Sequence, residues 1–305
     1  MNVSINPTYY CNFRCNFCYL TEKQLSDRNI LSIDKIDAML VEISHKHTID
    51  SIEIYGGEVG LLSFEYLNTL IDLCLSYTHS VNVVTNLSNI HLSFLRDDIT
   101  LSVSFDFHAR EKSNLVLNNM LKISRPFSMI VLVSPIILEM EPSNIINVFN
   151  GIKSITDVEL KPYSKNQANA LDVSHRQFDD YVKKWIALRS HMHFNFINLT
   201  MLDDVLAKRR NMYSDEHIYI TPEGFYGVLS FDSDDKEFFE LLDSFGDYQH
   251  WCTSEKQQVN NNGICVSCDF LGHCLTEHAR PFNSLSHNTC DGHVGLIKWY
   301  HQFGN

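Results

Sequence analysis

Most of the cysteines in this sequence stand at spacings that suit metal ligands. Three come near the start as Cx3Cx2C, and four come near the end as Cx2Cx5C with a more distant fourth. In order, they are Cys11, Cys15 and Cys18, then Cys265, Cys268, Cys274 and Cys290. Thiolates bind zinc and iron–sulfur clusters, and disulfide frameworks are rare in chains without a secretory signal. The spacing therefore predicts one metal centre at each end of the chain.

The first cysteine group cannot complete a four-ligand site by itself. A structural zinc ion takes four protein ligands, and no further cysteine or histidine follows within this loop. Three thiolates on a [4Fe–4S] cluster leave one iron open. Because an open iron can bind a substrate or a cofactor, this group indicates a catalytic cluster.

The residues around the first group resemble the signature of the radical S-adenosylmethionine (SAM) superfamily. The aromatic Phe17 precedes the third cysteine, which gives Cx3CxΦC. The segment Tyr55-Gly56-Gly57-Glu58 follows the second expected strand, where that superfamily has its Gly-Gly-Glu element. The resemblance implies a [4Fe–4S] cluster on the three cysteines, with SAM chelated by the open iron. It also implies reductive cleavage of SAM to a 5′-deoxyadenosyl radical, which abstracts a hydrogen atom from the substrate.

The same resemblance implies roles for residues near SAM. Gly56 and Gly57 would let the backbone approach the methionyl amino group, because glycine has no side chain. Glu58 would add charge or fix that loop, and Phe17 would pack near the adenine. The further expected contacts, to the ribose or to the carboxylate, are Ser104 and Ser134 at the ends of later strands.

On spacing alone, the second group fits either one zinc ion or one iron–sulfur cluster. It resembles the SPASM/twitch extension of peptide maturases and anaerobic sulfatase-maturing enzymes. That extension has a further cysteine where this chain has His278, and another in the preceding hairpin, which here has none. We therefore expect one auxiliary cluster, taken as [4Fe–4S], held by Cys265, Cys268, Cys274 and Cys290.

Three other side chains also need an interpretation. Cys74 lies on the apolar stripe of an expected helix and is interpreted as a buried structural thiol. Cys252 either packs in the interior or returns a hydrogen atom to the substrate, as an epimerase requires. Asp106 stands at a strand end where relatives place an acid near the substrate, although it could equally cap the following helix.

Short apolar runs alternate with longer helical patterns over the first two hundred residues. The expected strands are Val3–Ile5, Ser51–Tyr55, Ser80–Thr85, Ile99–Ser104, Phe127–Val133 and Val158–Leu160, and the main expected helices lie near 32–46, 67–75, 142–152 and 176–192. This alternation favours parallel strands joined by crossover helices. With the resemblance, it predicts an α/β protein whose residues 1–210 form a partial (β/α)6, TIM-like barrel. Chemistry in such folds lies at the carboxyl ends of the strands, where both motifs fall.

The pattern changes near residue 210. Residues 218–231 are expected to form a β-hairpin, and the chain from Glu255 onward is rich in polar residues and has little periodicity. A segment that can bury so little needs something other than packing to hold it, and a metal would do so. We expect residues 211–305 to form a small domain with a hairpin and the auxiliary cluster.

Composition limits the partners. With 24 basic and 37 acidic residues, the formal net charge is −13, which disfavours binding to nucleic acid or to anionic membranes. The chain has neither an apolar run long enough to span a membrane nor a secretory signal at its N-terminus, so a cytoplasmic location is expected.

The leading hypothesis is a radical SAM enzyme that crosslinks or epimerises a ribosomally made peptide. Expected partners are the precursor peptide and a reductant such as flavodoxin or ferredoxin. The peptide would be recognised by a separate leader-binding protein or by the barrel mouth. One alternative is the oxidation or epimerisation of a sugar or aminocyclitol. Another is a metal-binding interaction protein with an inactive barrel.

Overall fold

The computed structural model describes residues 1–163, 168, 171–229, 239–275, 290 and 292–303. His278, which the sequence marks as the departure from the extension's pattern, lies outside this part of the chain. None of the described helices has the length and the apolar character needed to cross a membrane.

One sheet of ten strands organises the described residues, in the order β10-β9-β8-β1-β2-β3-β4-β5-β6-β7. The strands are β1 (Asn2–Ile5), β2 (Ser51–Ile54), β3 (Val81–Thr85), β4 (Thr100–Ser104), β5 (Phe127–Val133), β6 (Ile155–Pro162), β7 (Asn195–Phe196), β8 (His217–Ile220), β9 (Tyr226–Leu229) and β10 (Phe239–Leu242). All neighbouring strands from β8 to β7 in this order run parallel. Strand β9 runs antiparallel to both of its neighbours, β8 and β10.

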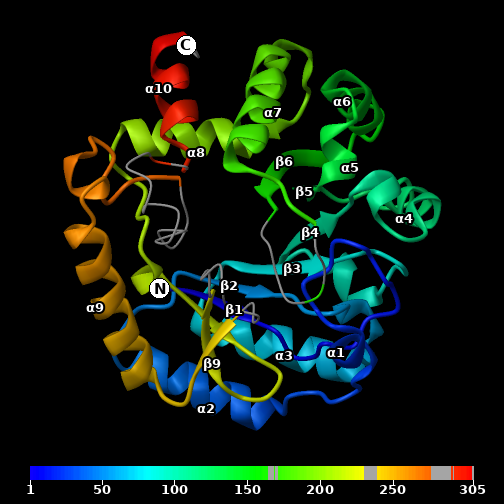
Figure 1. Ribbon diagram of the computed structural model, residues 1–305. Coiled ribbons are helices and arrows are strands. Elements are labelled where there is room, and N and C mark those ends of the chain that lie inside the picture. The colour runs from blue at the N-terminus through cyan, green and yellow to red at the C-terminus, as the bar shows by residue number, and fades with distance from the viewer. Residues whose placement is uncertain (164–167, 169–170, 230–238, 276–289, 291, 304–305) are drawn as a thin grey trace.

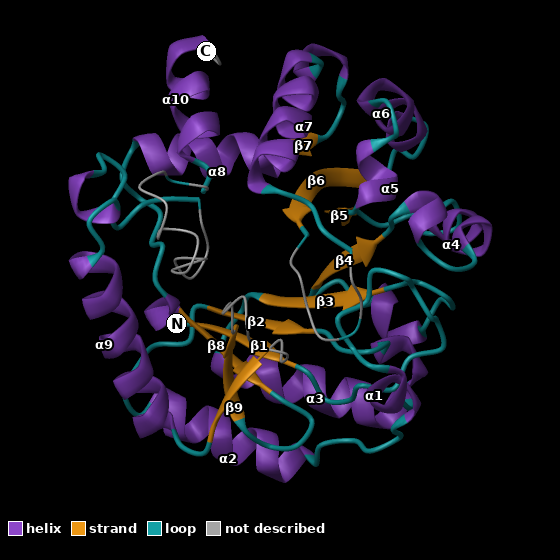
Figure 2. Cartoon of the chain, in the orientation of Figure 1, coloured by secondary structure: helices purple, strands orange, loops and turns teal. Residues whose placement is uncertain are grey.

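Helices cover the outer side of this curved sheet (Figures 1 and 2). They are α1 (Glu22–Ser26), α2 (Ile33–Ser44), α3 (Phe64–Tyr77), α4 (Ser113–Met120), α5 (Pro135–Leu138), α6 (Pro142–Asn150), α7 (His175–Ala187), α8 (Ile197–Leu206), α9 (Phe245–Asn261) and α10 (Val294–Phe303). The prediction of an α/β protein with a partial TIM-like barrel is confirmed.

Alternation along the strands separates a helix-facing layer from a barrel interior. In β5, Met129, Val131 and Val133 are fully buried, whereas Ile130 and Leu132 between them line the interior cavity described below. Successive strand residues point to opposite faces, so one sequence pattern supplies both the core and the cavity wall. The outer core is completed by apolar stripes on helices, such as that of α3, which buries Cys74 completely.

The predicted hairpin is present, but it belongs to the barrel sheet. Tyr219 pairs with Gly227 across the β8–β9 turn, where Gly224 has a φ of +82° that favours glycine. On its other side β8 runs parallel to β1, with Asn2 opposite His217 and Ile5 opposite Ile220. The sheet thus crosses the expected boundary at residue 210, and the division into two domains stays a prediction.

Candidate active site

A cavity of about 340 Å³ lies inside the barrel, against the loops at the carboxyl ends of the strands. It is lined by residues from both motifs of the first cysteine group and by later strand ends. Those used below are Cys11, Cys15, Phe17, Cys18, Gly56, Gly57, Glu58, Asn86, Ser104, Arg110, Lys161 and Tyr163. The two motifs, which are about forty residues apart in sequence, therefore face one cavity.

Backbone amides support the sulfur atoms of the first group. The amide of Phe13 donates to Cys11 Sγ over 3.4 Å, and that of Leu20 donates to Cys18 Sγ over 3.4 Å. Such bonds stabilise the thiolate form. Burial nevertheless raises the pKa of Cys11 to about 12 and that of Cys18 to about 11. The metal-free thiols are therefore protonated near neutral pH, and loading a metal must release protons.

The positions of the three thiols are compatible with a cluster that leaves one iron open. Within the described part of the chain, no three ligand side chains converge on a point that one metal ion could occupy. Each thiolate of an iron–sulfur cluster binds a different iron, so the sulfurs surround the cluster and do not meet at one point. Cys11, Cys15 and Cys18 all line one cavity, which suits that arrangement.

Gly56 and Gly57 are packed against the chain that leads into the first cysteine. A Cβ on Gly56 would lie 2.6 Å from the carbonyl oxygen of Thr8, and one on Gly57 would overlap the carbonyl oxygens of Tyr9 and Tyr10. The amide of Gly57 donates to Thr8 O over 2.9 Å. The structure thus gives these glycines a role that the sequence did not suggest, a close approach to the protein's own backbone.

Glu58 joins the ends of two strands. Its side chain is 1% exposed and accepts bonds from Thr85 Oγ1 at 2.6 Å, Asn86 N at 2.6 Å and Gly60 N at 2.7 Å. Burial raises its pKa, although these three bonds oppose the shift. Of the two roles expected for Glu58, this geometry favours fixing the loop.

Arg110, which the sequence analysis did not single out, presents a buried positive charge to the cavity. Its guanidinium binds Asp106 Oδ2 through Nε at 3.2 Å and Nη2 at 2.6 Å, and Nη2 also donates to Ser104 Oγ at 2.5 Å. It also lies 5.5 Å from the ring centre of Phe17. The spacing of Asp106 and Arg110, four residues apart after a strand, was the available signal.

Two expected contacts are placed away from the cavity. Asp106 is fully buried, accepts the amide of Leu132 at 2.6 Å and does not line the cavity. Its side chain does not cap the following turn either. In place of a substrate-facing acid or a helix cap, the structure shows a carboxylate paired with Arg110. Ser134 stands at the start of α5, is 1% exposed and is not among the lining residues.

The cavity lining is also rich in tyrosine and carries two opposite charges. The lining residues include Tyr19, Glu53, Tyr55, Lys161, Tyr163 and Tyr219. The rings of Tyr55 and Tyr219 lie edge to face, with centres 6.2 Å apart. Period-2 alternation through β2 and β6 could have located Glu53, Tyr55 and Lys161 as inward positions.

The second cysteine group gathers from two segments. Cys265 begins a short 3-10 turn, and the amide of Cys268 donates to Cys265 O over 2.9 Å. The pKa of Cys265 is raised to about 11, first by burial and then by the charges of Cys290, Cys268 and Cys274. The four thiols therefore lie within electrostatic range of one another, although Cys290 comes from a separate stretch of chain.

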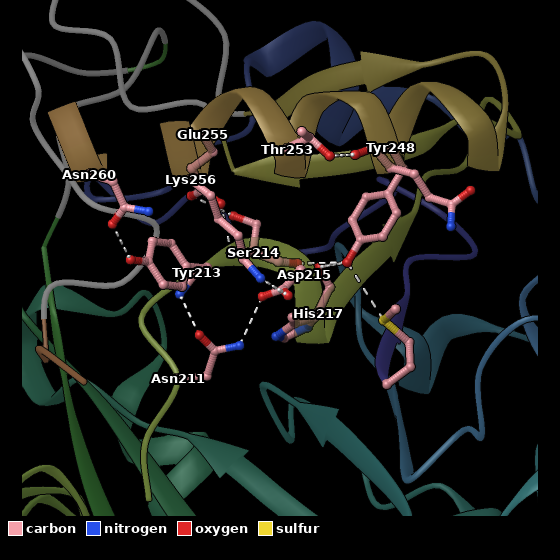
Figure 3. A network of polar contacts seen from close by, with 12 residues as sticks. Asn211, Tyr213, Ser214, Asp215, His217, Tyr248, Thr253, Glu255, Lys256 and Asn260 are labelled. Carbon is pink, nitrogen blue, oxygen red and sulfur yellow. Dashed lines mark hydrogen bonds and ion pairs between the residues drawn. The ribbon is translucent and has the colours of Figure 1, made fainter. Parts of the chain in front are cut away.

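Cys252 lies on α9 in a packed contact and does not line the cavity. Figure 3 shows its neighbours on that helix, Tyr248 and Glu255, directed at the segment before β8. Tyr248 donates to Ser214 O at 2.6 Å, and Glu255 accepts from Ser214 N at 2.8 Å. Burial raises the pKa of Glu255 to about 7. This surrounding favours the packing interpretation of Cys252, and its role as a hydrogen donor stays a prediction.

The fold and this cavity define a class: a partial α/β barrel with a cysteine-triad loop beside a Gly-Gly-Glu turn. Residues 5–124 match the family model of the radical SAM superfamily, which confirms the resemblance found in the sequence. No curated protein sequence matches the chain.

Solved structures of similar fold extend the likeness to the whole chain. SuiB of Streptococcus suis bound to S-adenosylmethionine is 14% identical, with a TM-score of 0.64 over 95% of this chain and 75% of SuiB. SuiB bound to its precursor peptide SuiA is 16% identical, with a TM-score of 0.65 over 95% and 74%. The structure of anSMEcpe with AdoMet and the Kp18Cys peptide is 13% identical, with a TM-score of 0.68 over 100% and 98%.

Proposed function

We propose that this protein is a radical SAM enzyme that modifies a ribosomally made peptide. The observation that carries the proposal is the single cavity onto which the cysteine triad, the Gly-Gly-Glu turn and the paired Arg110 all open. A match of residues 5–124 to the superfamily supports it. Peptides bound to SuiB and to anSMEcpe support the substrate class.

Cys11, Cys15 and Cys18 would hold a [4Fe–4S] cluster with one open iron for SAM. When bound and reduced, these groups supply a 5′-deoxyadenosyl radical that abstracts a hydrogen atom from the substrate. A one-electron donor such as flavodoxin or ferredoxin is the proposed reductant. Burial of Cys11 and Phe17 limits the access of water to the site.

Arg110 is the proposed partner of the SAM carboxylate. Asp106 and Ser104 orient its guanidinium, so its charge is in place before the cofactor arrives. We assign Ser104 to that supporting role in place of direct contact. Phe17, across from Arg110, remains the proposed neighbour of the adenine. Gly56, Gly57 and Glu58 hold the loop that faces the methionyl group.

The second cysteine group is proposed to hold one auxiliary cluster that passes electrons. Crosslinking removes two electrons in total, so the cluster would offer a route for the second. Epimerisation would need a hydrogen donor, and Cys252 does not line the cavity. We therefore place crosslinking ahead of epimerisation. The other proposed features are a cytoplasmic location and a leader-binding protein or the barrel mouth as the site of peptide recognition.

Anaerobic reconstitution tests the first part of this proposal. About eight irons per chain, falling to about four in the Cys11/Cys15/Cys18→Ala variant, would support two [4Fe–4S] clusters. With dithionite, the intact protein should convert SAM to 5′-deoxyadenosine and methionine, and the triad variant should not. Cys74→Ala is the matched control, because this thiol is buried on α3 and does not line the cavity, so iron content and cleavage should stay unchanged. Zinc without iron would overturn the proposal.

Incubation with a leader-bearing peptide tests the substrate class. A product lighter by two hydrogen atoms supports crosslinking. An unchanged mass in ordinary water with deuterium uptake from heavy water supports epimerisation instead. SAM cleavage coupled to consumption of a sugar or aminocyclitol, with the peptide unchanged, would contradict the peptide assignment.

A further inference from the structure

Cys290 stands apart from the other three cysteines of its group. It follows Cys274 by sixteen positions and is exposed, and the amide of Gly292 donates to its Sγ over 3.4 Å. Cys265, Cys268 and Cys274 share one short segment. That segment is tied to the chain before β8, where the amide of Met212 donates to Gly272 O at 3.1 Å. A four-thiolate site forms only if Cys290 is fixed relative to this segment.

A buried polar contact lies three positions further along the chain. His293 is 3% exposed, and its Nδ1 lies 2.6 Å from Oδ1 of Asp179, which is 5% exposed on α7. The ring centre of His293 is 4.6 Å from that of His175 and 5.5 Å from that of Phe178. One turn of a barrel helix therefore surrounds this side chain.

His293 also starts the last helix. Its carbonyl oxygen accepts the amide of Ile297 at 3.1 Å, in the first turn of α10. Further along, Tyr300 donates to Asp203 of α8 at 2.8 Å, and Figure 1 shows α10 beside α7 and α8. The chain just after Cys290 is thus attached to the barrel at a buried polar contact first and at an outer hydrogen bond second.

We propose that the buried Asp179–His293 pair is the positioning element that brings Cys290 to the other three thiolates and so completes the second metal site. Packed apolar residues alone would tolerate small slips of α10, whereas a buried hydrogen-bonded pair is satisfied in one register only. Neither residue is among the proposed metal ligands. The proposal rests on the proposed auxiliary cluster and adds the reason why a ligand from a separate segment reaches it.

The test uses the full chain with Cys11, Cys15 and Cys18 changed to Ala, so that only the second site takes metal. Reconstitution should give about four irons per chain, and Asp179→Ala should lower this to fewer than one, with loss of the cluster's visible absorption. Asp179→Asn keeps an oxygen that can accept from Nδ1 and should restore most of the iron. Tyr300→Phe is the matched control on the same helix and should keep all of it.

Each result has one meaning. Full iron in Asp179→Ala would overturn the inference, as would equal loss in Tyr300→Phe, which would make α10 docking in general the cause. Full iron in Cys265→Ala would instead overturn the auxiliary cluster itself. If Asp179→Ala is insoluble, His293→Ala replaces it, and circular dichroism of each variant separates loss of metal from loss of fold.

Discussion

The two proposed metal sites of this molecule are built in opposite ways. The first takes its ligands from one loop, residues 11 to 18, and the backbone behind that loop is packed against Gly57 and tied through Glu58 to the end of β3. The second would take its ligands from residues 265 to 290 in two segments, and the proposed fourth ligand, Cys290, is exposed. The first site is preorganised by buried hydrogen bonds and close backbone contacts. The second depends on the docking of helices.

This contrast teaches where each site obtains its stability. A preorganised loop keeps its shape without metal, so the bound group adds little to folding there. A site assembled from separate segments gains much of its order from the metal, because binding free energy becomes folding free energy. Substitutions and metal removal should therefore affect the two sites differently.

The sharpest test of the contrast is Gly57→Ala. A Cβ there would overlap the carbonyl oxygens of Tyr9 and Tyr10, so the loop before Cys11 must move. We expect loss of the iron of the first site and a fall in SAM cleavage of at least about 100-fold, with the metal of the second site retained. Gly246→Ala is the control, since its Cβ would meet only Ser244 Oγ, at 3.5 Å. Loss of metal from both sites would remove the distinction.

Metal removal should loosen the second site more than the first. In anaerobic hydrogen exchange, metal-free protein should lose protection at least about tenfold in the segment 262–275, because little packing replaces the metal there. The segment 5–20 should change far less, since Phe13 and Leu20 remain in the core. Equal loss of protection in both segments would contradict the comparison.

A buried carboxylic acid near the second site should give the protein a pH-dependent stability. The folded-state pKa of Glu255 is raised to about 7 from 4.5. The folded state then holds a proton that the unfolded state has released, so stability is complete below about pH 4.5 and declines until about pH 7. The shift corresponds to roughly 3 kcal/mol, or a fall in Tm of about 5 °C between pH 5 and pH 8.

The matched variants for this prediction are Glu255→Gln and Glu240→Gln. The first should abolish the decline, because glutamine imitates the protonated acid. The second changes an exposed carboxylate on β10 and should preserve it. A decline that persists in Glu255→Gln would assign the pH dependence to another group.

The smallest expected effect is that of Ser104→Ala in the first site. The variant removes the 2.5 Å bond from Arg110 Nη2 but leaves the two bonds to Asp106. A preorganised site should tolerate this loss, so we expect a rise of about threefold in the KM for SAM with kcat unchanged. An effect as large as that of Gly57→Ala would mean that the first site is less redundant than its hydrogen bonds indicate.

Sequence reasoning placed residues best where a motif is compact in the chain. The triad loop, the Gly-Gly-Glu turn and the α/β alternation depend on local spacing, and the cavity brings both motifs together. Arg110 and Lys161 were missed because their place in the cavity follows from the closure of several strands. Ser134 was expected there because it follows a strand, but its strand end directs it into the start of α5.

The hairpin illustrates the same limit. Its turn and strands were visible in the sequence, because Gly224 and the flanking apolar residues are local signals. Its parallel pairing with β1 was not, because no local pattern records a partner more than two hundred residues away. Likewise, nothing in the spacing of the last cysteines pointed to Asp179 as the anchor for the chain that follows Cys290.

The pairing of β1 with β8 also has a consequence for the order of folding. One edge of β1 can pair with β2 as soon as about fifty residues have been made, but its other edge waits for residues 217–220. Contacts so distant in sequence form slowly, since the chain entropy of closing a long loop opposes them. During synthesis, the triad loop and its glycine turn can therefore meet while one edge of β1 is still open. Delivery of iron to the first site could then precede closure of the barrel, and the second site would be the last part of the molecule to mature.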